Sequence, residues 1–143
     1  MRIKEITDKD ICDVARTMVS AYSEEPWHEN WSMDKAERRV RAILYNYGSL
    51  GLMAQENQEV VGAVLGYIDP YAEEDFFYIS EIFVRAGRRK NGIGTVLLSK
   101  LEEKLLLQEV RVIQLMSIQH NIPFYEKNKM TKDSIYIMYK RID

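Results

Sequence analysis

Hydrophobic positions three or four residues apart predict two helices in the first third of the chain. Ile11, Val14 and Met18 would share one face of the first helix, because 3.6 residues complete a turn. Residues 32–47 carry a second stripe of this kind, and Gly48 then supplies a residue that easily adopts the left-handed conformation found at many helix ends. The residues before the first helix predict a short opening strand.

Short β-prone runs follow in the middle of the chain. Residues 50–55 and 60–68 flank a polar pentapeptide and predict a hairpin, and residues 76–84 predict a third strand. Beyond a basic loop, Ile93 and the leucines at i+4 steps after it predict a long amphipathic helix. The remaining expected elements are a strand over residues 110–118, a short helix over 123–129 and a final strand over 134–139.

This order of strands and helices favours a single α/β domain, residues 1–143, built around a mixed sheet. A chain of 143 residues buries roughly 68–70% of the surface that its unfolded form would expose, so it can fold alone. No internal repeat or linker divides the sequence.

Composition and charge argue against several classes of protein. A net charge of -2 argues against a broad surface for nucleic acid or anionic lipid, and neither is an expected partner. Cys12 is the single cysteine, which excludes an internal disulfide and a zinc site built on cysteine pairs. No apolar run reaches the length of a membrane span, and residues 1–10 do not lead into the apolar core of a secretion signal. A cytoplasmic location is therefore expected.

A basic, glycine-containing loop over residues 84–94 joins the strand at 76–84 to the amphipathic helix. Glycines let backbone N–H groups approach a ligand closely, and the N-terminus of a helix favours an anion. Four cations in the loop would complement a multiply charged phosphate, although a solvated basic loop is equally compatible with the charges alone. These cations are Arg85, Arg88, Arg89 and Lys90.

Two common phosphate-binding patterns do not fit this loop. Gly87 and Gly92 have the spacing of the Walker A motif, but Ile93 and Gly94 stand where the motif needs Lys and Ser or Thr. The Rossmann pattern ends on a third small residue, and Leu97 occupies that position. The sequence therefore disfavours both ATP hydrolysis and NAD binding.

Arg89, Gly92 and Gly94 form the pattern R-x-x-G-x-G, which resembles the signature of the GCN5-related N-acetyltransferase (GNAT) family. The family places this signature, as here, after a strand that ends in valine and before a long amphipathic helix. Lys90 and Ala86 depart from the glycine and the proline that the family usually has. The resemblance implies a single-domain GNAT-like α/β (α+β) fold with a mixed, mostly antiparallel sheet and helices on both faces. It also implies acetyl-CoA as co-substrate and no metal.

In this family the loop amides bind the pyrophosphate of coenzyme A, and the end of the preceding strand positions the pantetheine arm and the thioester. A second stretch, Asn121 to Lys127, resembles the other signature of the family, an Asn before a short helix that carries F-Y-E-K. Lys129 and Met130 replace the Gly-Phe that commonly follows. By resemblance, the residues expected to bind coenzyme A are Ile82, Phe83, Val84, Arg89, Lys90, Asn91, Gly92, Ile93, Gly94, Thr95, Asn121 and Phe124.

Tyr125 and Glu81 are the expected catalytic residues. By resemblance Tyr125 is the general acid that protonates the leaving thiolate, a task for which a phenol is chemically adequate; a packed aromatic ring is the alternative. Strand alternation puts Glu81 on one face with Phe77 and Ile79, where desolvation would suit a base. A bulge would change that face. Water as the base, and Glu81 as a binding group for the amine, are equally open.

The acceptor side is expected in the connection between the first two helices, where carboxylates and aromatic rings suit a cationic amine. The residues expected to bind the acceptor are Glu25, Trp27, Trp31 and Tyr78. The predicted function is acetyl-CoA-dependent transfer to a primary amine by direct attack in a ternary complex, with a small cationic acceptor such as an aminoglycoside or polyamine. The alternatives are a non-catalytic acyl-CoA-binding regulatory domain and an enzyme that acts on protein N-termini or lysines. A homodimer is left open.

Overall fold

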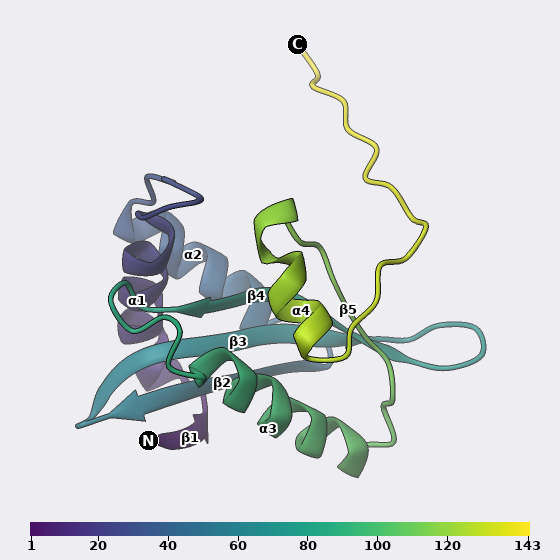
Figure 1. Ribbon diagram of the computed structural model, residues 1–143, viewed down its shortest axis with the longest axis horizontal. Helices are drawn as coiled ribbons and strands as arrows, with labels where there is room; N and C mark the ends of the chain where they lie inside the picture. Colours follow the sequence, from purple (N-terminus) through teal and green to yellow (C-terminus); the bar gives the residue numbers. More distant parts are fainter.

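In the computed structural model, which describes residues 1–143, a five-stranded sheet separates two layers of helices (Figure 1). The strands lie side by side in chain order. Neighbours pair antiparallel except β4 and β5, which are parallel, so the sheet is mixed and mostly antiparallel as predicted. The strands are β1 (Arg2–Glu5), β2 (Ser49–Glu56), β3 (Glu59–Asp69), β4 (Phe76–Val84) and β5 (Ile113–Leu115).

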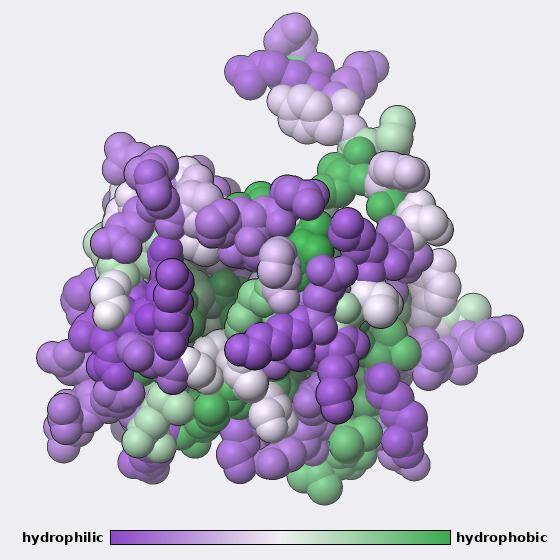
Figure 2. Space-filling view, viewed as in Figure 1, coloured by the Kyte–Doolittle hydropathy of each residue, from purple (hydrophilic) through white to green (hydrophobic).

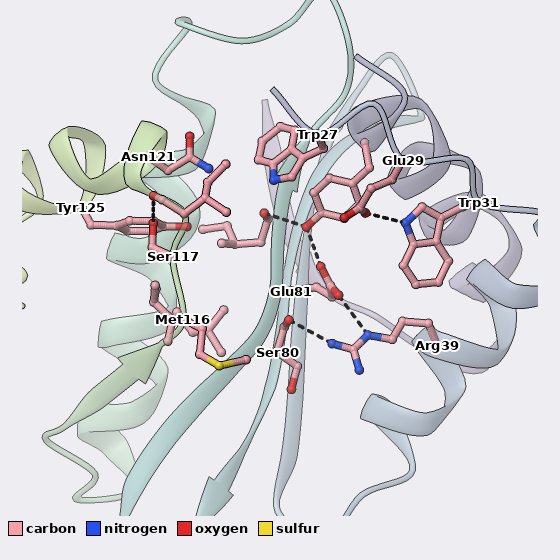
Figure 3. A pocket seen from close by; sticks show the side chains of 15 residues that line it. Trp27, Glu29, Trp31, Arg39, Ser80, Glu81, Met116, Ser117, Asn121 and Tyr125 are labelled. Atoms are coloured by element: carbon pink, nitrogen blue, oxygen red, sulfur yellow. Dashed lines mark hydrogen bonds and ion pairs between the residues drawn. The ribbon is translucent and has the colours of Figure 1, made fainter. Parts of the chain in front are cut away.

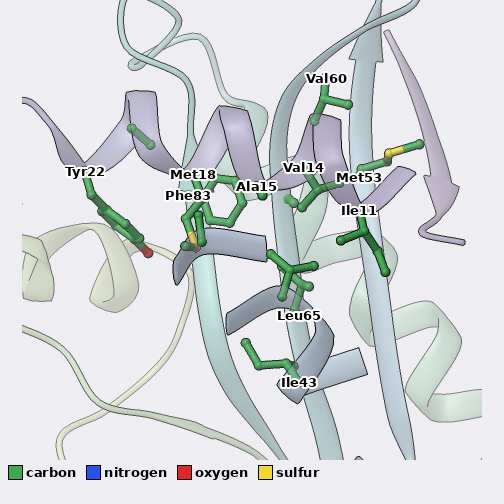
Figure 4. Close-up of a cluster of buried hydrophobic side chains, with 14 residues drawn as sticks. Ile11, Val14, Ala15, Met18, Tyr22, Ile43, Met53, Val60, Leu65 and Phe83 are labelled. Atoms are coloured by element: carbon green, nitrogen blue, oxygen red, sulfur yellow. The ribbon is translucent and has the colours of Figure 1, made fainter. Parts of the chain in front are cut away.

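Helices cover both faces of the sheet, and each layer has its own apolar cluster. The helices are α1 (Ile11–Tyr22), α2 (Met33–Leu44), α3 (Ile93–Leu107) and α4 (Ile122–Lys127), with short 3-10 turns η1 (Asp8–Asp10) and η2 (Gln119–Asn121). Met53, Leu65 and Phe83 pack against α1 and α2 on one face (Figure 4). Val64 and Phe77 pack against α3 on the other face. None of the helices combines the length and the apolar composition needed to cross a bilayer.

A bulge at Ser80 in β4 decides the orientation of the residues that follow it. Leu65 of β3 pairs with Glu81 while Gly66 pairs with Ile79, so Ser80 is an extra residue on β4. The side-chain alternation therefore changes between Ile79 and Glu81. Ile79 belongs to the α3 cluster, whereas Glu81 contacts α1 and α2 on the opposite face. The expectation that Glu81 shares a face with the apolar residues before it is wrong for this reason.

Gly66 allows β3 and β4 to approach each other closely at this bulge. A Cβ atom at Gly66 would lie 2.0 Å from the carbonyl oxygen of Tyr78 and 2.8 Å from a ring carbon of Phe77. Both distances are far below van der Waals contact, so no side chain fits there without moving the backbone. The orientation of Glu81 thus depends on a glycine in the neighbouring strand.

The end of the chain differs most from the sequence prediction. The strand expected over residues 110–118 is reduced to the three residues of β5. The strand expected over 134–139 is wrong, because these residues form no strand and no backbone hydrogen bond joins them to the sheet. They extend away from the body of the molecule instead (Figure 1). Residues 134–139 are β-prone in composition, but no strand of the chain pairs with them.

Candidate active site

A cavity of about 360 Å³ opens where β4 and β5 separate (Figure 3). The two parallel strands pair only over residues 77–79 of β4 and 113–115 of β5. Residues 79–82 continue one wall of the cavity and residues 115–118 continue the other. Side chains from α1, α2, the loop between them and α4 complete the lining. The cavity therefore has a β4 wall, backed by α1 and α2, and a β5 wall, which leads into α4.

Glu81 on the β4 wall is held by neighbours on α1 and α2 (Figure 3). The Tyr22 hydroxyl donates to Glu81 Oε1 at 2.5 Å, and Arg39 Nε donates to Glu81 Oε2 at 2.9 Å. Arg39 also donates from a terminal nitrogen to the Ser80 carbonyl oxygen at 3.3 Å. The Glu81 side chain is only 13% exposed. Its surroundings are thus an ion pair and a phenol, and the expected apolar setting for a base is wrong.

Tyr22 and Arg39 are site residues that the sequence did not identify. Burial raises the pKa of Tyr22 far above its usual range, and the negative charge of Glu81 raises it further. The phenol is therefore a neutral hydrogen-bond donor, and its ring packs edge-on against Trp27 with 5.0 Å between ring centres. In the sequence Tyr22 is one member of an apolar helical stripe and Arg39 one of three arginines in α2, so no pattern singles either out.

Tyr125 points into the cavity from α4, on the side opposite Glu81 (Figure 3). Burial, and then the charge of Glu81, raise the pKa of Tyr125 to about 12. The phenol consequently keeps its proton at neutral pH. Asn121 also lines the cavity, and its side chain does not cap α4, which leaves its amide available to a ligand. The predicted pair Tyr125 and Asn121 is thus brought into one cavity with Glu81.

The N-terminus of α3 is suited to binding a phosphate. Gly92 is its N-cap at φ 79°, no side chain caps the helix, and its first turn holds no carboxylate. The first backbone N–H groups of a helix have no partner within it, so they can donate to an anion. A Cβ atom at Gly92 would meet nothing within 4 Å, which leaves open space over these amides. The residues present here fit the pyrophosphate of coenzyme A.

Most of the cations in this loop are engaged by the protein itself. Arg85 pairs with Glu59 at 3.1 Å, and Arg88 pairs with Glu56 at 2.6 Å. Lys90, which adopts φ 66°, forms no ion pair. The loop therefore presents fewer free positive charges to a phosphate than its sequence indicates. The backbone amides that begin α3 are accordingly more important than the loop side chains as candidate phosphate-binding groups.

Arg89 joins the loop to the acceptor side of the cavity. Its guanidinium donates to the backbone carbonyl oxygens of Ala21 and, at 2.7 Å, of Glu25. It also lies over the Trp27 ring, 4.9 Å from the ring centre. Because carbonyl groups at the end of α1 lack partners within the helix, Arg89 satisfies groups that would otherwise be unpaired. The signature arginine thus supports the connection between α1 and α2.

The other residues expected to bind coenzyme A differ in what they expose. Ile82 lines the cavity. Phe83 and Ile93 are buried in the two apolar clusters, so only their backbone atoms can face a ligand. Asn91 donates from its side chain to the Arg88 carbonyl oxygen at 3.2 Å. Phe124 packs against the first turn of α3, where a Cβ atom at Gly94 would lie 2.9 Å from its ring.

The residues expected to bind the acceptor are divided by the structure. Trp27 and Trp31 line the cavity together with Glu29, whose carboxylate accepts a hydrogen bond from the Trp31 indole at 2.8 Å. The Glu25 side chain is 89% exposed and lies outside the lining, as does Tyr78. The acidic and aromatic character expected of this region is therefore supplied by Glu29 and the two tryptophans.

Comparisons with known proteins agree with this architecture. The family model described as the Acetyltransferase (GNAT) family matches residues 16–130, a span that contains the cavity and the loop before α3. Acetyltransferase ECA0875 of Pectobacterium atrosepticum is 30% identical over 125 residues, which are 85% of this chain and 75% of that protein.

Two solved structures show the similarity of the fold. A possible acetyltransferase from Clostridium difficile 630 superposes with a TM-score of 0.81 at 17% identity, over 99% of this chain and 97% of that one. The aminoglycoside acetyltransferase meta-AAC0020, from an uncultured soil metagenomic sample and solved with sisomicin, has a TM-score of 0.78 at 15% identity, over 99% and 96% of the two chains. With the family match over most of its length, the chain belongs to the GNAT family of acetyltransferases.

Proposed function

We propose that the protein moves an acetyl group from acetyl-CoA to a primary amine by direct attack in a ternary complex. The observation that carries this proposal is a single cavity in which protonated Tyr125 lies across from Glu81. The uncapped N-terminus of α3 adjoins it, because Phe124 packs on the first turn of that helix. A donor site and a proton-donating group therefore meet in one place.

The acetyl group would come from a thioester, which acetyl-CoA supplies. The amides that begin α3 would hold the pyrophosphate, and the side-chain amide of Asn121 would bind the pantetheine arm. Backbone groups of Phe83, whose side chain is buried, would orient the rest of the arm. In this proposal the donor lies along the gap between β4 and β5.

The proposed reaction of an ammonium acceptor needs three proton movements. The ammonium first loses one proton to water, which frees the lone pair of its nitrogen. The nitrogen then forms a bond to the acetyl carbon, the carbon–sulfur bond breaks, and the nitrogen loses its surplus proton to water. Tyr125 gives its proton to the departing sulfur and is reprotonated from solvent. Both carboxylate oxygens of Glu81 already accept hydrogen bonds, which favours Glu81 as the group that attracts the ammonium and orders this water.

We propose a small cationic amine, such as an aminoglycoside or a polyamine, as the acceptor. Glu29 contributes a carboxylate to the cavity, and Trp27 and Trp31 contribute aromatic faces that attract cations. The similarly folded aminoglycoside acetyltransferase solved with sisomicin supports this class of acceptor. Protein N-termini and lysines form the competing class. The cytoplasmic location stays a prediction.

Release of free thiol from acetyl-CoA, measured across a panel of aminoglycosides, polyamines and peptides, tests the proposal. We expect release with at least one cationic small molecule. Acetylated peptide without reaction on the small amines would move the acceptor to the competing class. No release with any acceptor, combined with a thermal shift by acetyl-CoA, would contradict catalysis and favour a regulatory acyl-CoA-binding domain. Ligand at a hundredfold excess over Kd adds about 2.7 kcal/mol to the free energy of unfolding.

A further inference from the structure

Arg89 lies in the loop before α3, where hydrophilic side chains gather on the surface (Figure 2), but it makes its contacts in another part of the molecule. The resemblance to the GNAT family implies that this residue binds coenzyme A. In the structure one terminal nitrogen of its guanidinium donates to the backbone oxygen of Ala21, and the other donates to that of Glu25 at 2.7 Å. Because the guanidinium is a rigid fork, two such bonds fix its orientation. Arg89 is thus directed at the end of α1 and the segment that follows it.

This segment, residues 23–32, joins α1 to α2, and we call it the acceptor loop. Its own hydrogen bonds are local. The backbone N–H groups of residues 27–29 donate to Glu24 and Tyr22, and the remaining bonds stay within the loop or join it to α1 and α2. Arg89 is therefore the only residue outside the acceptor loop and its two flanking helices that forms a hydrogen bond with the loop.

Trp27 extends the contact of Arg89 into the cavity. The guanidinium lies over the Trp27 ring, 4.9 Å from the ring centre. The same ring packs edge-on against Tyr22, whose hydroxyl donates to Glu81 at 2.5 Å. All three of these partners line the cavity (Figure 3). Arg89 thus supports, from behind, the part of the cavity where the acceptor amine is proposed to bind.

The neighbouring arginines of the same loop have no such link. Arg85 and Arg88 pair with carboxylates at the turn between β2 and β3, and neither lines the cavity or bonds to the acceptor loop. The backbone amides that begin α3 are open to a phosphate without any help from Arg89. The loop therefore offers its amides to the donor, whereas the Arg89 side chain is engaged on the acceptor side.

We propose that Arg89 is a positioning residue for the acceptor and not a ligand of the donor. It holds Trp27 and the acceptor loop against Tyr22 and Glu81, so its loss weakens the use of the amine. Its loss affects acetyl-CoA binding no more than the removal of any other single charge from the loop. This role rests on the proposed transfer of an acetyl group to an amine.

Arg89→Ala and Arg85→Ala form a matched pair, because each removes one positive charge from the same loop. We expect Arg89→Ala to lower kcat/KM for the amine roughly 10- to 100-fold, because a displaced wall misplaces the attacking nitrogen. Arg85→Ala should leave this value unchanged at saturating acetyl-CoA. Titration calorimetry should show that both variants weaken acetyl-CoA binding by the same factor, under about fivefold. Arg89→Lys, which keeps the charge but loses the fork, should fall between the wild type and Arg89→Ala in kcat/KM for the amine.

Two outcomes of these measurements would overturn the proposal. A larger loss of acetyl-CoA affinity in Arg89→Ala than in Arg85→Ala would make Arg89 a donor ligand. Equal kcat/KM for the amine in the two variants would show that Arg89 does not position the acceptor. Arg89→Lys takes the place of Arg89→Ala in each comparison if the alanine variant does not fold.

Trp27 fluorescence tests the contact without any turnover. The chain has two tryptophans, so Trp31→Phe leaves Trp27 as the only one. In this background Arg89→Ala should raise the acrylamide quenching constant of Trp27, and Arg85→Ala should not. If no amine reacts, the proposed function fails, but the quenching still decides whether Arg89 holds Trp27. Quenching that is the same with and without the Arg89 side chain would show that the inference is wrong.

Discussion

The two walls of the cavity are held in different ways. On the β4 wall, Glu81 is fixed by Tyr22 and Arg39, and Arg39 is fixed in turn by the Ser80 carbonyl group. On the β5 wall, the strand pairs with its neighbour over three residues only, and Phe124 packing on the start of α3 anchors the helix that follows. One wall is a network of polar contacts on a continuous sheet. The other is a short strand and a short helix.

This difference matches the two tasks of the proposed reaction. Glu81 must present a charge at a constant position, so a network that fixes both of its oxygens serves it. Tyr125 has to reach the sulfur only as the thioester breaks, so it needs no comparable network around its hydroxyl. We therefore expect substitutions on the β5 wall to change activity more than stability, and substitutions on the β4 wall to change both.

The largest effect is expected at the acid. Tyr125→Phe should lower kcat by roughly 10²–10⁴-fold, because it removes the proton that the leaving sulfur takes. The free energy of unfolding should change little, since the ring and its edge-on contact with Phe124 remain. Steady-state kinetics with acetyl-CoA and an accepted amine, together with urea unfolding, measure both quantities.

Tyr47→Phe is the control for the acid, because Tyr47 is 82% exposed and lies outside the cavity lining. It should leave kcat unchanged. A Tyr125→Phe enzyme with full kcat between pH 7 and 10 would remove Tyr125 from the mechanism, and with it the functional half of the comparison between the walls.

The second effect is expected at the bulge that orients the β4 wall. Gly66→Ala should lower the free energy of unfolding by about 3 kcal/mol, because its Cβ would meet the Tyr78 carbonyl oxygen at 2.0 Å and force the strands apart. Gly62→Ala on the same strand is a graded control, with its closest contact at 2.9 Å to the Phe83 carbonyl oxygen. Equal costs for the two variants in urea unfolding would argue that close approach at the bulge does not hold this wall.

The bulge in β4 is also a feature that could not be predicted from the sequence. The helices α1, α2 and α3 follow from apolar spacing that is local to each segment. The face of Glu81 depends on an extra residue at Ser80 and on Gly66 in another strand, and neither is a local pattern. Strand alternation alone therefore placed Glu81 on the wrong face.

The same reasoning applies to the site and to residues 134–139. Asn121 and Tyr125, which line the cavity, could be predicted together because they lie in one short motif. Arg39 joins the cavity only through its contact with Glu81, 42 positions along the chain. Residues 134–139 have the composition of a strand, but a strand exists only where a partner offers its backbone. Sequence indicates propensity there and cannot indicate the partner.

A third effect is expected in the ion pair of the β4 wall. A double-mutant cycle with Glu81→Gln and Arg39→Met should give a coupling of about 1–2 kcal/mol in the free energy of unfolding, because Glu81 is mostly buried and Arg39 partly so. Asn121→Ala on the β5 wall should cost under about 0.5 kcal/mol. A coupling near zero, or a larger cost at Asn121, would reverse the assignment of which wall is rigid.

The smallest effect is expected in alkaline solution and concerns Tyr125 alone. Its pKa is about 12 in the folded protein, above the value of roughly 10 for an unfolded tyrosine. Folding therefore favours the protonated phenol, so its contribution to stability is complete below pH 10 and is lost as the pH rises toward 12. Between pH 9 and 11 the wild type should lose about 1 kcal/mol more than Tyr125→Phe in denaturant unfolding. Tyr22, whose pKa is also raised, is present in both proteins, so its contribution cancels in the difference between them.

Parallel pH profiles of the two proteins would mean that water already reaches the Tyr125 phenol. The β5 wall would then be looser than its short strand implies.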